Sequence, residues 1–170
     1  MGLVILFGAS GAGKTSIARA FSAAQPSVAE VCFFDSIGVP SSEEMAARYG
    51  SGEGWQEAMT AEWLARIAVR LKAGSNVLFE GQTRPSFVAG GALAAGIGEF
   101  KMVLVDCDDE TRARRLGEQR GQPELATASM MNWARFLRDE AGRGGHLILN
   151  TSVMPIAAAV ATVRTMFHQV

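Results

Sequence analysis

The residues best suited to chemistry form a short glycine-rich run near the N-terminus. It reads Gly8-Ala9-Ser10-Gly11-Ala12-Gly13-Lys14-Thr15, a complete G-x-x-x-x-G-K-[ST] pattern, and Ser16 follows it. Glycines let the backbone wrap so that successive N–H groups point at phosphate oxygens. Lys14 is expected to bridge the β- and γ-phosphates, and the Thr15 hydroxyl to bind Mg²⁺. The pattern would arise by chance in roughly one in a few hundred chains of this length, so it predicts nucleotide binding.

The elements that must position this run alternate along the whole chain. Short apolar runs predict buried strands at 3–7, 31–35, 77–80, 102–106 and 147–150. Helical patterns lie between them at 14–24, 42–49, 55–72, 86–95, 109–120, 127–141 and 156–167. This alternation is typical of βαβ units. It predicts an α/β fold of three layers, with a central parallel sheet of five strands.

Three carboxylates end apolar runs of this kind. They are Asp35, Glu80 and Asp106. Ligands in open α/β sheets bind outside the carboxyl ends of the strands, so each carboxylate can face a bound nucleotide or its reaction partner. A carboxylate near an acceptor hydroxyl can orient it and take its proton. For Asp35 the alternative interpretation is a cap or Asx turn for the segment that follows.

Composition narrows the classes of partner. The chain has 170 residues and a formal net charge of −1, which is unlike the basic balance of a general nucleic-acid binder. Its two cysteines have neither disulfide nor zinc spacing, which favours the reducing cytoplasm. Neither a signal peptide nor a membrane span is predicted. The histidines His146 and His168 are interpreted as structural.

Three further segments resemble motifs of one group of enzymes. Residues 78–85 read L-F-E-G-Q-T-R-P and look like the adenylate kinase pattern L-[LIV]-D-G-[FY]-P-R. Residues 105–116 read V-D-C-D-D-E-T-R-A-R-R-L and are similar to the D-x-P-D-E-x-x-x-x-R run of nucleoside monophosphate kinases. Residues 147–152 read L-I-L-N-T-S and resemble the D-T-S turn of shikimate and gluconate kinase-like proteins. The chain therefore resembles P-loop small-molecule and nucleotide kinases of the adenylate kinase-like type.

The resemblance implies roles for the acidic residues and for one arginine. Glu80 would order the Mg²⁺ shell together with Thr15, and Asp106 is the alternative acid. Arg84 would hold the acceptor, as the matching arginine of adenylate kinases holds the acceptor's phosphate. Asp35 would face the acceptor hydroxyl, as the acid at this place does in shikimate kinase-like and chloramphenicol phosphotransferase-like proteins.

The resemblance also implies an adenylate kinase-like P-loop NTPase fold with a short lid, in a single domain over 1–170. Residues of about 36–73 would form the acceptor-binding helical region, and about 115–140 the lid. Arg115 and Arg120 would be lid arginines, with Arg138 a weaker candidate. The adenine pocket would be lined by Asn150, Thr151 and Ser152.

Departures from the family pattern leave the acceptor open. Gln82 and Thr83 replace the usual aromatic or apolar residue and the proline before Arg84, and Asn150 replaces an aspartate. The expected function is transfer of the γ-phosphoryl group of ATP, with Mg²⁺, to a nucleoside, nucleotide, sugar or other alcohol. The expected partners are ATP and this acceptor, without nucleic acid or membrane. The alternatives are a nucleotide-binding regulatory protein and a stand-alone NTPase.

Overall fold

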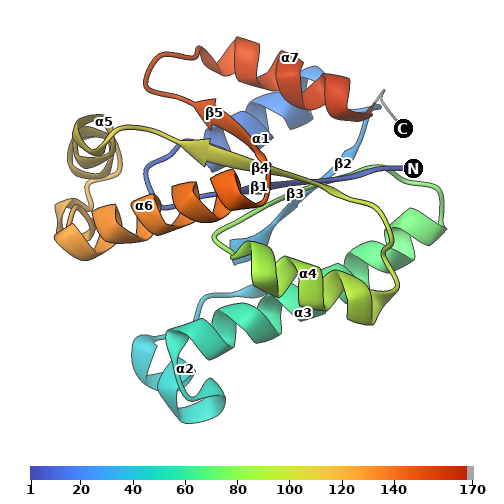
Figure 1. Ribbon diagram of the computed structural model, residues 1–170, viewed down its shortest axis with the longest axis horizontal. Coiled ribbons are helices and arrows are strands. Elements are labelled where there is room, and N and C mark those ends of the chain that lie inside the picture. The colour runs from blue at the N-terminus through green and yellow to red at the C-terminus, as the bar shows by residue number, and fades with distance from the viewer. Residues whose placement is uncertain (168–170) are drawn as a thin grey trace.

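Five parallel strands form the central sheet of the computed structural model, which describes residues 1–167 (Figure 1). They are β1 (Leu3–Phe7), β2 (Glu30–Phe33), β3 (Val77–Gly81), β4 (Lys101–Asp106) and β5 (Leu147–Asn150). Their spatial order is β2-β3-β1-β4-β5, and all neighbours run parallel. This order places β1, the strand that leads into the glycine-rich run, in the middle of the sheet. The predicted α/β fold is confirmed.

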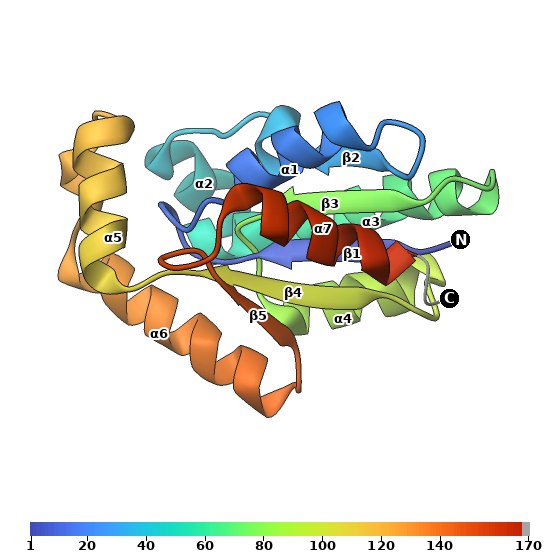
Figure 2. The same ribbon diagram turned by 90° about the horizontal axis from the view of Figure 1, so that it is seen from above.

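Helices cover both faces of the sheet. They are α1 (Lys14–Ala24), α2 (Ser42–Tyr49), α3 (Gly52–Lys72), α4 (Pro85–Ala95), α5 (Asp109–Arg114), α6 (Ala128–Arg143) and α7 (Ile156–Phe167). Figures 1 and 2 show α1 and α7 on one side of the sheet and α3, α4 and α6 on the other. Among the described residues, no helix is both long enough and apolar enough to cross a bilayer.

Alternation along β1 explains the two layers of core. Successive side chains of a strand point to opposite faces. Leu3, Ile5 and Phe7 pack with residues of α3, α4 and α6 in one buried cluster. Val4 and Leu6 pack with residues of α1 and α7 in the other. Burial on both faces explains why the strand reads as a continuous apolar run rather than an alternating one.

The end of the second strand differs from its prediction over 31–35. Strand β2 ends at Phe33, and Phe34–Ile37 form a 3₁₀ turn, η1. Phe34 is buried, and the Ser36 hydroxyl donates a hydrogen bond to the Phe33 carbonyl at 2.7 Å. This local bond replaces the sheet ladder, so Asp35 lies in a turn just beyond the strand. His168 lies outside the described residues.

The predicted helix over 109–120 also differs. It begins at Asp109, where the Asp108 carboxylate accepts a hydrogen bond from the Thr111 N–H at 2.6 Å. After Arg114 it widens into a π turn, η2 (Arg115–Gln119), in which the Arg120 N–H donates to the Arg115 carbonyl at 3.1 Å. A short 3₁₀ turn, η3 (Pro123–Leu125), then leads to α6. Such π turns are frequent at functional sites.

Candidate active site

The glycine-rich run turns sharply between β1 and α1. Gly8 has φ +149°, and a Cβ added there would lie 2.2 Å from the Val105 carbonyl oxygen of β4. Gly13 is left-handed, with φ +98°, and directly precedes the first residue of α1. These two positions therefore need glycine, one for close backbone approach and one for its backbone conformation. The loop ends at the N-terminus of α1, where a helix favours anions.

Lys14 is held inside the loop. Its side chain is buried, and Nζ donates a hydrogen bond to the Ala9 carbonyl at 3.1 Å. Burial lowers the pKa of Lys14, while the carboxylates of Glu80 and Asp35 raise it. An ammonium group taken out of water gains from any anion that reaches it. The site therefore suits a phosphate group close to Nζ.

Thr15 and Glu80 form the oxygen pair expected of a magnesium site. The Thr15 hydroxyl donates to the Glu80 Oε1 at 2.9 Å, across the end of β3. Burial raises the pKa of Glu80, and the Lys14 ammonium and the Thr15 hydrogen bond lower it. Hard oxygen donors are the ligands that Mg²⁺ prefers, and this ion usually keeps several waters and substrate oxygens as well. The residues present therefore fit Mg²⁺.

Asp106, the alternative magnesium acid, is occupied by two arginines. Its Oδ1 accepts from Arg112 Nη2 at 2.7 Å, and its Oδ2 accepts from Arg138 Nε at 2.6 Å. Both carboxylate oxygens are thus used in ion pairs, whereas Glu80 faces the Thr15 hydroxyl. This contrast favours Glu80 as the magnesium acid.

Arg112 is the site residue that the sequence analysis did not single out. It is fully buried, and its Nη1 donates to the Ser10 carbonyl at 2.7 Å. It therefore ties the phosphate loop to Asp106 and β4. The signal was present in the sequence, since Arg112 precedes Arg115 by three residues and shares its helix face. Its depth of burial, however, depends on how α5 packs against the loop.

Arg115 binds the phosphate loop from the side of the turn that follows β5. Its Nη2 donates to the Thr151 carbonyl and its Nη1 to the Thr151 hydroxyl, both at 2.8 Å. Nη1 also reaches the carbonyls of Gly11 and Ala12 at 3.4 Å. The planar guanidinium group suits several fixed acceptors at once. Arg115 thereby joins the lid segment, the phosphate loop and the turn after β5.

A cavity of about 380 Å³ opens beside these residues. Four cations line it, and all of them lie on α1 or in and around the π turn: Lys14, Arg19, Arg115 and Arg120. Thr15 and Ser16 line it too. Such a concentration of positive charge around backbone N–H groups fits a polyphosphate. The structure thus brings the predicted lid arginines to the phosphate loop.

A second cavity of about 250 Å³ adjoins the first and shares Gly13, Ser16 and Arg115 with it. Its other walls are largely apolar and include Ile17, Met154 and Ile156. Thr151 lines it, whereas Asn150 and Ser152 support the turn. The Ser152 N–H donates to the Asn150 side-chain oxygen at 3.0 Å, and the Ser152 hydroxyl accepts from the Asp108 N–H at 2.8 Å. The cavity suits the flat apolar faces of a nucleobase.

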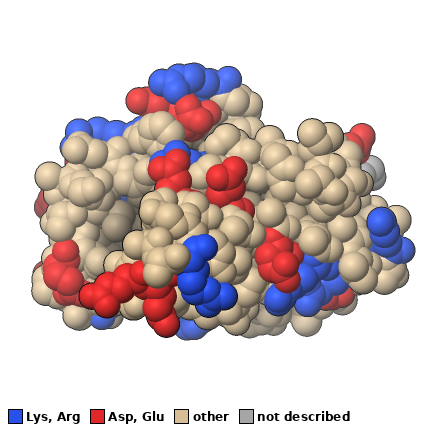
Figure 3. Space-filling view, turned by 90° about the horizontal axis from the view of Figure 1, so that it is seen from below, with Lys and Arg blue, Asp and Glu red and all other residues tan. Residues whose placement is uncertain are grey.

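The acceptor-side candidates lie at the same edge of the sheet but are spread further apart. The Asp35 side chain is exposed and makes no hydrogen bond within residues 1–167, which disfavours the capping interpretation. Arg84 precedes α4 and forms an ion pair with Glu53 of α3 at 2.6 Å. Figure 3 shows a hollow near this end of the molecule, with acidic side chains along its rim.

The residues that follow β3 connect the phosphate loop to the acceptor side. The Ser10 hydroxyl of the phosphate loop donates to the Gln82 side-chain oxygen at 3.1 Å. The next residue, Thr83, shares a buried hydrogen bond of 2.8 Å with Thr60 of α3. The residues at 82 and 83, which depart from the family pattern, thus link the phosphate loop to the helical region.

Solved structures with this fold include several small-molecule kinases. A sugar kinase from Janibacter sp. HTCC2649 matches with a TM-score of 0.71 and 17% identity, over 97% of this chain and 93% of that one. Shikimate kinase from Acinetobacter baumannii, in complex with shikimate, matches with 0.66 and 15%, over 99% and 93%. The APS kinase CysC of Mycobacterium tuberculosis, in complex with AMPPNP and APS, matches with 0.61 and 17%, over 99% and 98%.

These likenesses extend over the whole described fold. No protein-family model matches the chain, and no curated protein matches it. At such low identities the shared feature is the fold itself: an α/β fold with a parallel sheet of order 2-3-1-4-5, typical of P-loop proteins of the nucleoside monophosphate kinase type. The resemblance seen in the sequence motifs is therefore confirmed at the level of the fold.

Proposed function

We propose that the protein transfers the γ-phosphoryl group of ATP, with Mg²⁺, to a hydroxyl group of a small-molecule acceptor. The observation that carries this proposal is the cavity beside the phosphate loop, where Lys14, Arg115 and Arg120 gather next to the Thr15–Glu80 pair. Phosphoryl transfer asks a protein mainly for positioning and for neutralisation of charge on the phosphates. The described residues offer both.

Each group has a distinct part in the proposed mechanism. Lys14 and the loop N–H groups hold the β- and γ-phosphates, and Arg115 and Arg120 neutralise charge that spreads over the transferred group. Thr15 and Glu80 would hold Mg²⁺, which supplies further charge neutralisation on the phosphates when bound. Asn150, Thr151 and Ser152 form the turn beside the nucleobase cavity.

The acceptor would enter from the side of η1 and α3. Asp35 orients its hydroxyl group and takes the proton as the new oxygen–phosphorus bond forms and the bond to ADP breaks. We assign acceptor binding to the helical region of about 36–73 and closure to the lid of about 115–140. Closure of such a segment excludes water, which otherwise competes as acceptor.

The test is ATP consumption by the purified protein with a panel of nucleosides, nucleotides, sugars and other alcohols. We expect at least one acceptor to raise turnover above the background with water. Lys14→Ala should lower that turnover by about a thousandfold, since it removes a charge aimed at the reacting phosphate. Asp35→Asn should lower acceptor phosphorylation while ATP affinity changes little.

The matched control for Asp35 is Glu99→Gln, which removes an exposed carboxylate from the loop before β4, outside the proposed acceptor region. It should leave turnover near that of the parent protein. ATP binding without any acceptor-stimulated turnover would overturn the proposal and favour a nucleotide-binding regulator. Equal turnover with water and with every acceptor would favour a stand-alone NTPase.

A further inference from the structure

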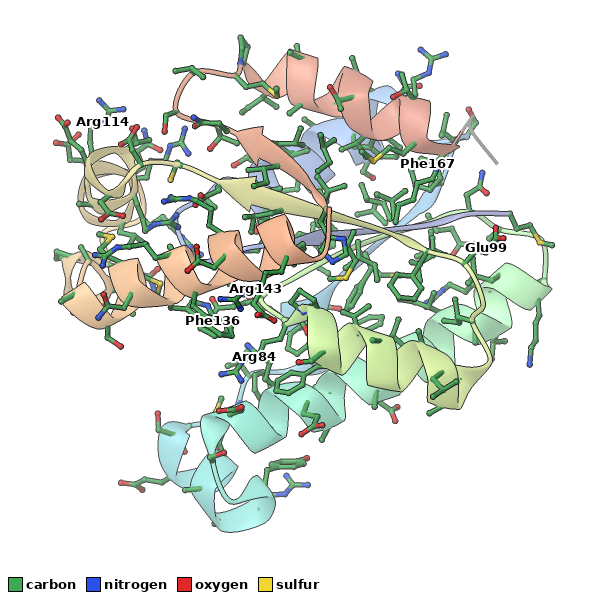
Figure 4. The ribbon with its side chains drawn as sticks, viewed as in Figure 1. Arg84, Glu99, Arg114, Phe136, Arg143 and Phe167 are labelled. Carbon is green, nitrogen blue, oxygen red and sulfur yellow. The ribbon has the colours of Figure 1, made fainter. Side chains whose placement is uncertain are left out.

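The surroundings of Arg84 are unusual for a residue expected to grip an anion. Its Nη1 is bound to Glu53 Oε1 at 2.6 Å. Three aromatic rings lie over or beside its guanidinium carbon: Trp133 at 5.0 Å, and Phe87 and Phe136 at 5.3 Å. Figure 4 shows Arg84 and Phe136 facing each other across the space between α6 and α3. We call these five side chains the Arg84 box.

Two buried hydrogen-bond donors of the Arg84 box have no partner within residues 1–167. The Arg84 Nε and the Trp133 Nε1 are buried, and neither has a hydrogen-bond partner among the described residues. Both atoms can only donate. A buried donor without a partner costs free energy, so a ligand that supplies an oxygen acceptor would relieve it. One neutral oxygen, such as a hydroxyl or carbonyl, accepts two such bonds.

The charge around the box argues against an anionic ligand. A carboxylate or phosphate is held best by the paired N–H groups of a free guanidinium, but Arg84 Nη1 is already bound to the Glu53 carboxylate. Two arginines of α6 are paired as well, Arg138 with Asp106 at 2.6 Å and Arg135 with Asp109 at 3.7 Å. A second anion placed here would meet the carboxylate of Glu53.

We propose that the acceptor presents an uncharged oxygen and an apolar or ring face to the Arg84 box, and that Glu53 is the residue that excludes anionic acceptors. This inference rests on the proposed function and names its substrate class. Arg84 then binds the acceptor through Nε, while the rings of Trp133, Phe136 and Phe87 cover the apolar part. The anion-binding role that the resemblance implies for Arg84 is thereby replaced.

The first test compares acceptors in pairs that differ by one charged group: shikimate with its methyl ester, gluconate with sorbitol, and AMP with adenosine. We expect kcat/KM for ATP-dependent phosphorylation to favour the neutral member of a productive pair by about tenfold, the scale of one repulsive charge contact near a surface. Glu53→Gln should narrow or reverse that preference. Preference for the anionic member by the parent protein would overturn the inference.

The second test needs no turnover, so it separates this inference from the proposed function. Binding of gluconate and of shikimate is measured by calorimetry on the parent protein, on Glu53→Gln and on the double variant Glu53→Gln/Arg84→Met. We expect Glu53→Gln to bind these carboxylates at least about tenfold more tightly than the parent. The double variant should lose that gain.

The control is Glu57→Gln, which removes an exposed glutamate one helical turn further along α3. It should bind carboxylates as the parent does. Unchanged carboxylate affinity in Glu53→Gln would overturn the inference, even if a productive acceptor is found. A gain in affinity would support it even if no acceptor in the panel is phosphorylated, in which case only the proposed function fails.

Discussion

Two arginine–carboxylate pairs of nearly equal length lie in two regions of this molecule. Arg112 and Asp106 are 2.7 Å apart beside the phosphate loop, with side chains 0% and 7% exposed. Arg84 and Glu53 are 2.6 Å apart on the acceptor side, with side chains 26% and 56% exposed. The first pair also binds a loop carbonyl, at Ser10. The second lies among aromatic side chains of two helices, α4 and α6.

The difference lies in what each pair holds in place. Around the phosphate loop, side chains bind the backbone, and these bonds hold the loop in the conformation described. On the acceptor side, side chains bind one another, and a partly exposed ion pair such as that of Arg84 and Glu53 contributes little to stability. We infer that the proposed nucleotide site is preorganised and that the proposed choice of acceptor depends on a few contacts between side chains.

The largest effect on stability is expected at Asp106. Asp106→Asn leaves Arg112 buried without a charged partner, and such a loss costs about 3–5 kcal/mol. Urea unfolding measures the change. The control Asp109→Asn, whose partner Arg135 is exposed, should lose below about 1 kcal/mol. A double variant Asp106→Asn/Arg112→Met should recover part of the loss. If Asp106→Asn costs as little as the control, the buried pair does not stabilise the protein more than an exposed one.

A smaller effect is expected at Arg115. Arg115→Ala removes its bonds to Thr151 and should weaken binding of a non-hydrolysable ATP analogue by about tenfold, or 1.4 kcal/mol. Arg115→Lys should not restore binding, because an ammonium group cannot reproduce the planar fork. Calorimetry measures both, with the exposed Arg114→Ala as the control. Full recovery by lysine would show that charge alone matters.

An effect of similar size, on stability rather than on binding, is expected where α3 meets the end of β3. Thr60→Val leaves the buried Thr83 hydroxyl without its partner, which costs about 1–2 kcal/mol in the free energy of unfolding. The double variant Thr60→Val/Thr83→Val should cost less than the sum of the single variants, because it leaves neither hydroxyl unpaired. Additive losses in urea unfolding would mean that this hydrogen bond does not couple α3 to the end of β3.

The smallest effect on stability is expected at Glu53. Glu53→Gln should lower the free energy of unfolding by below about 1 kcal/mol, and 1 M salt should remove the difference. The loss in Asp106→Asn should persist in salt, because buried pairs are screened much less. Comparable losses and salt responses in both variants would mean that burial does not distinguish the two regions.

Most of the fold follows from local patterns that the sequence displays. The strands at 3–7 and 147–150 and the helices at 14–24, 42–49 and 156–167 have the predicted bounds, since apolar periodicity and local sequence fix them. The contacts of Glu53 with Arg84 could not be predicted. The two residues are 31 apart in the chain, and only tertiary packing brings α3 and α4 together.

The candidate site also divides into features set by local sequence and features set by tertiary packing. The phosphate loop was predicted because its function depends on backbone conformations that require glycine, and the glycines can be read directly from the sequence. The burial of Arg112 and the choice between Glu80 and Asp106 depend on which side chains occupy the space between elements. A propensity or a motif carries no information on such competition, so the sequence leaves Asp106 open as an alternative to Glu80.

The π turn at Arg115–Gln119 gives the lid a register that a regular helix would not have. In an α-helix, a residue five positions further on is rotated by about 140° around the axis. A π turn takes up one extra residue, so Arg120 is rotated by only about 40° from Arg115. The extra residue thus acts as a spacer that brings both arginines to one cavity. Substitutions that turned this segment into a regular α-helix of the same length would rotate Arg120 away from the phosphate loop, whereas deletion of one residue, such as Gly117, would leave Arg120 four positions from Arg115 and still about 40° away.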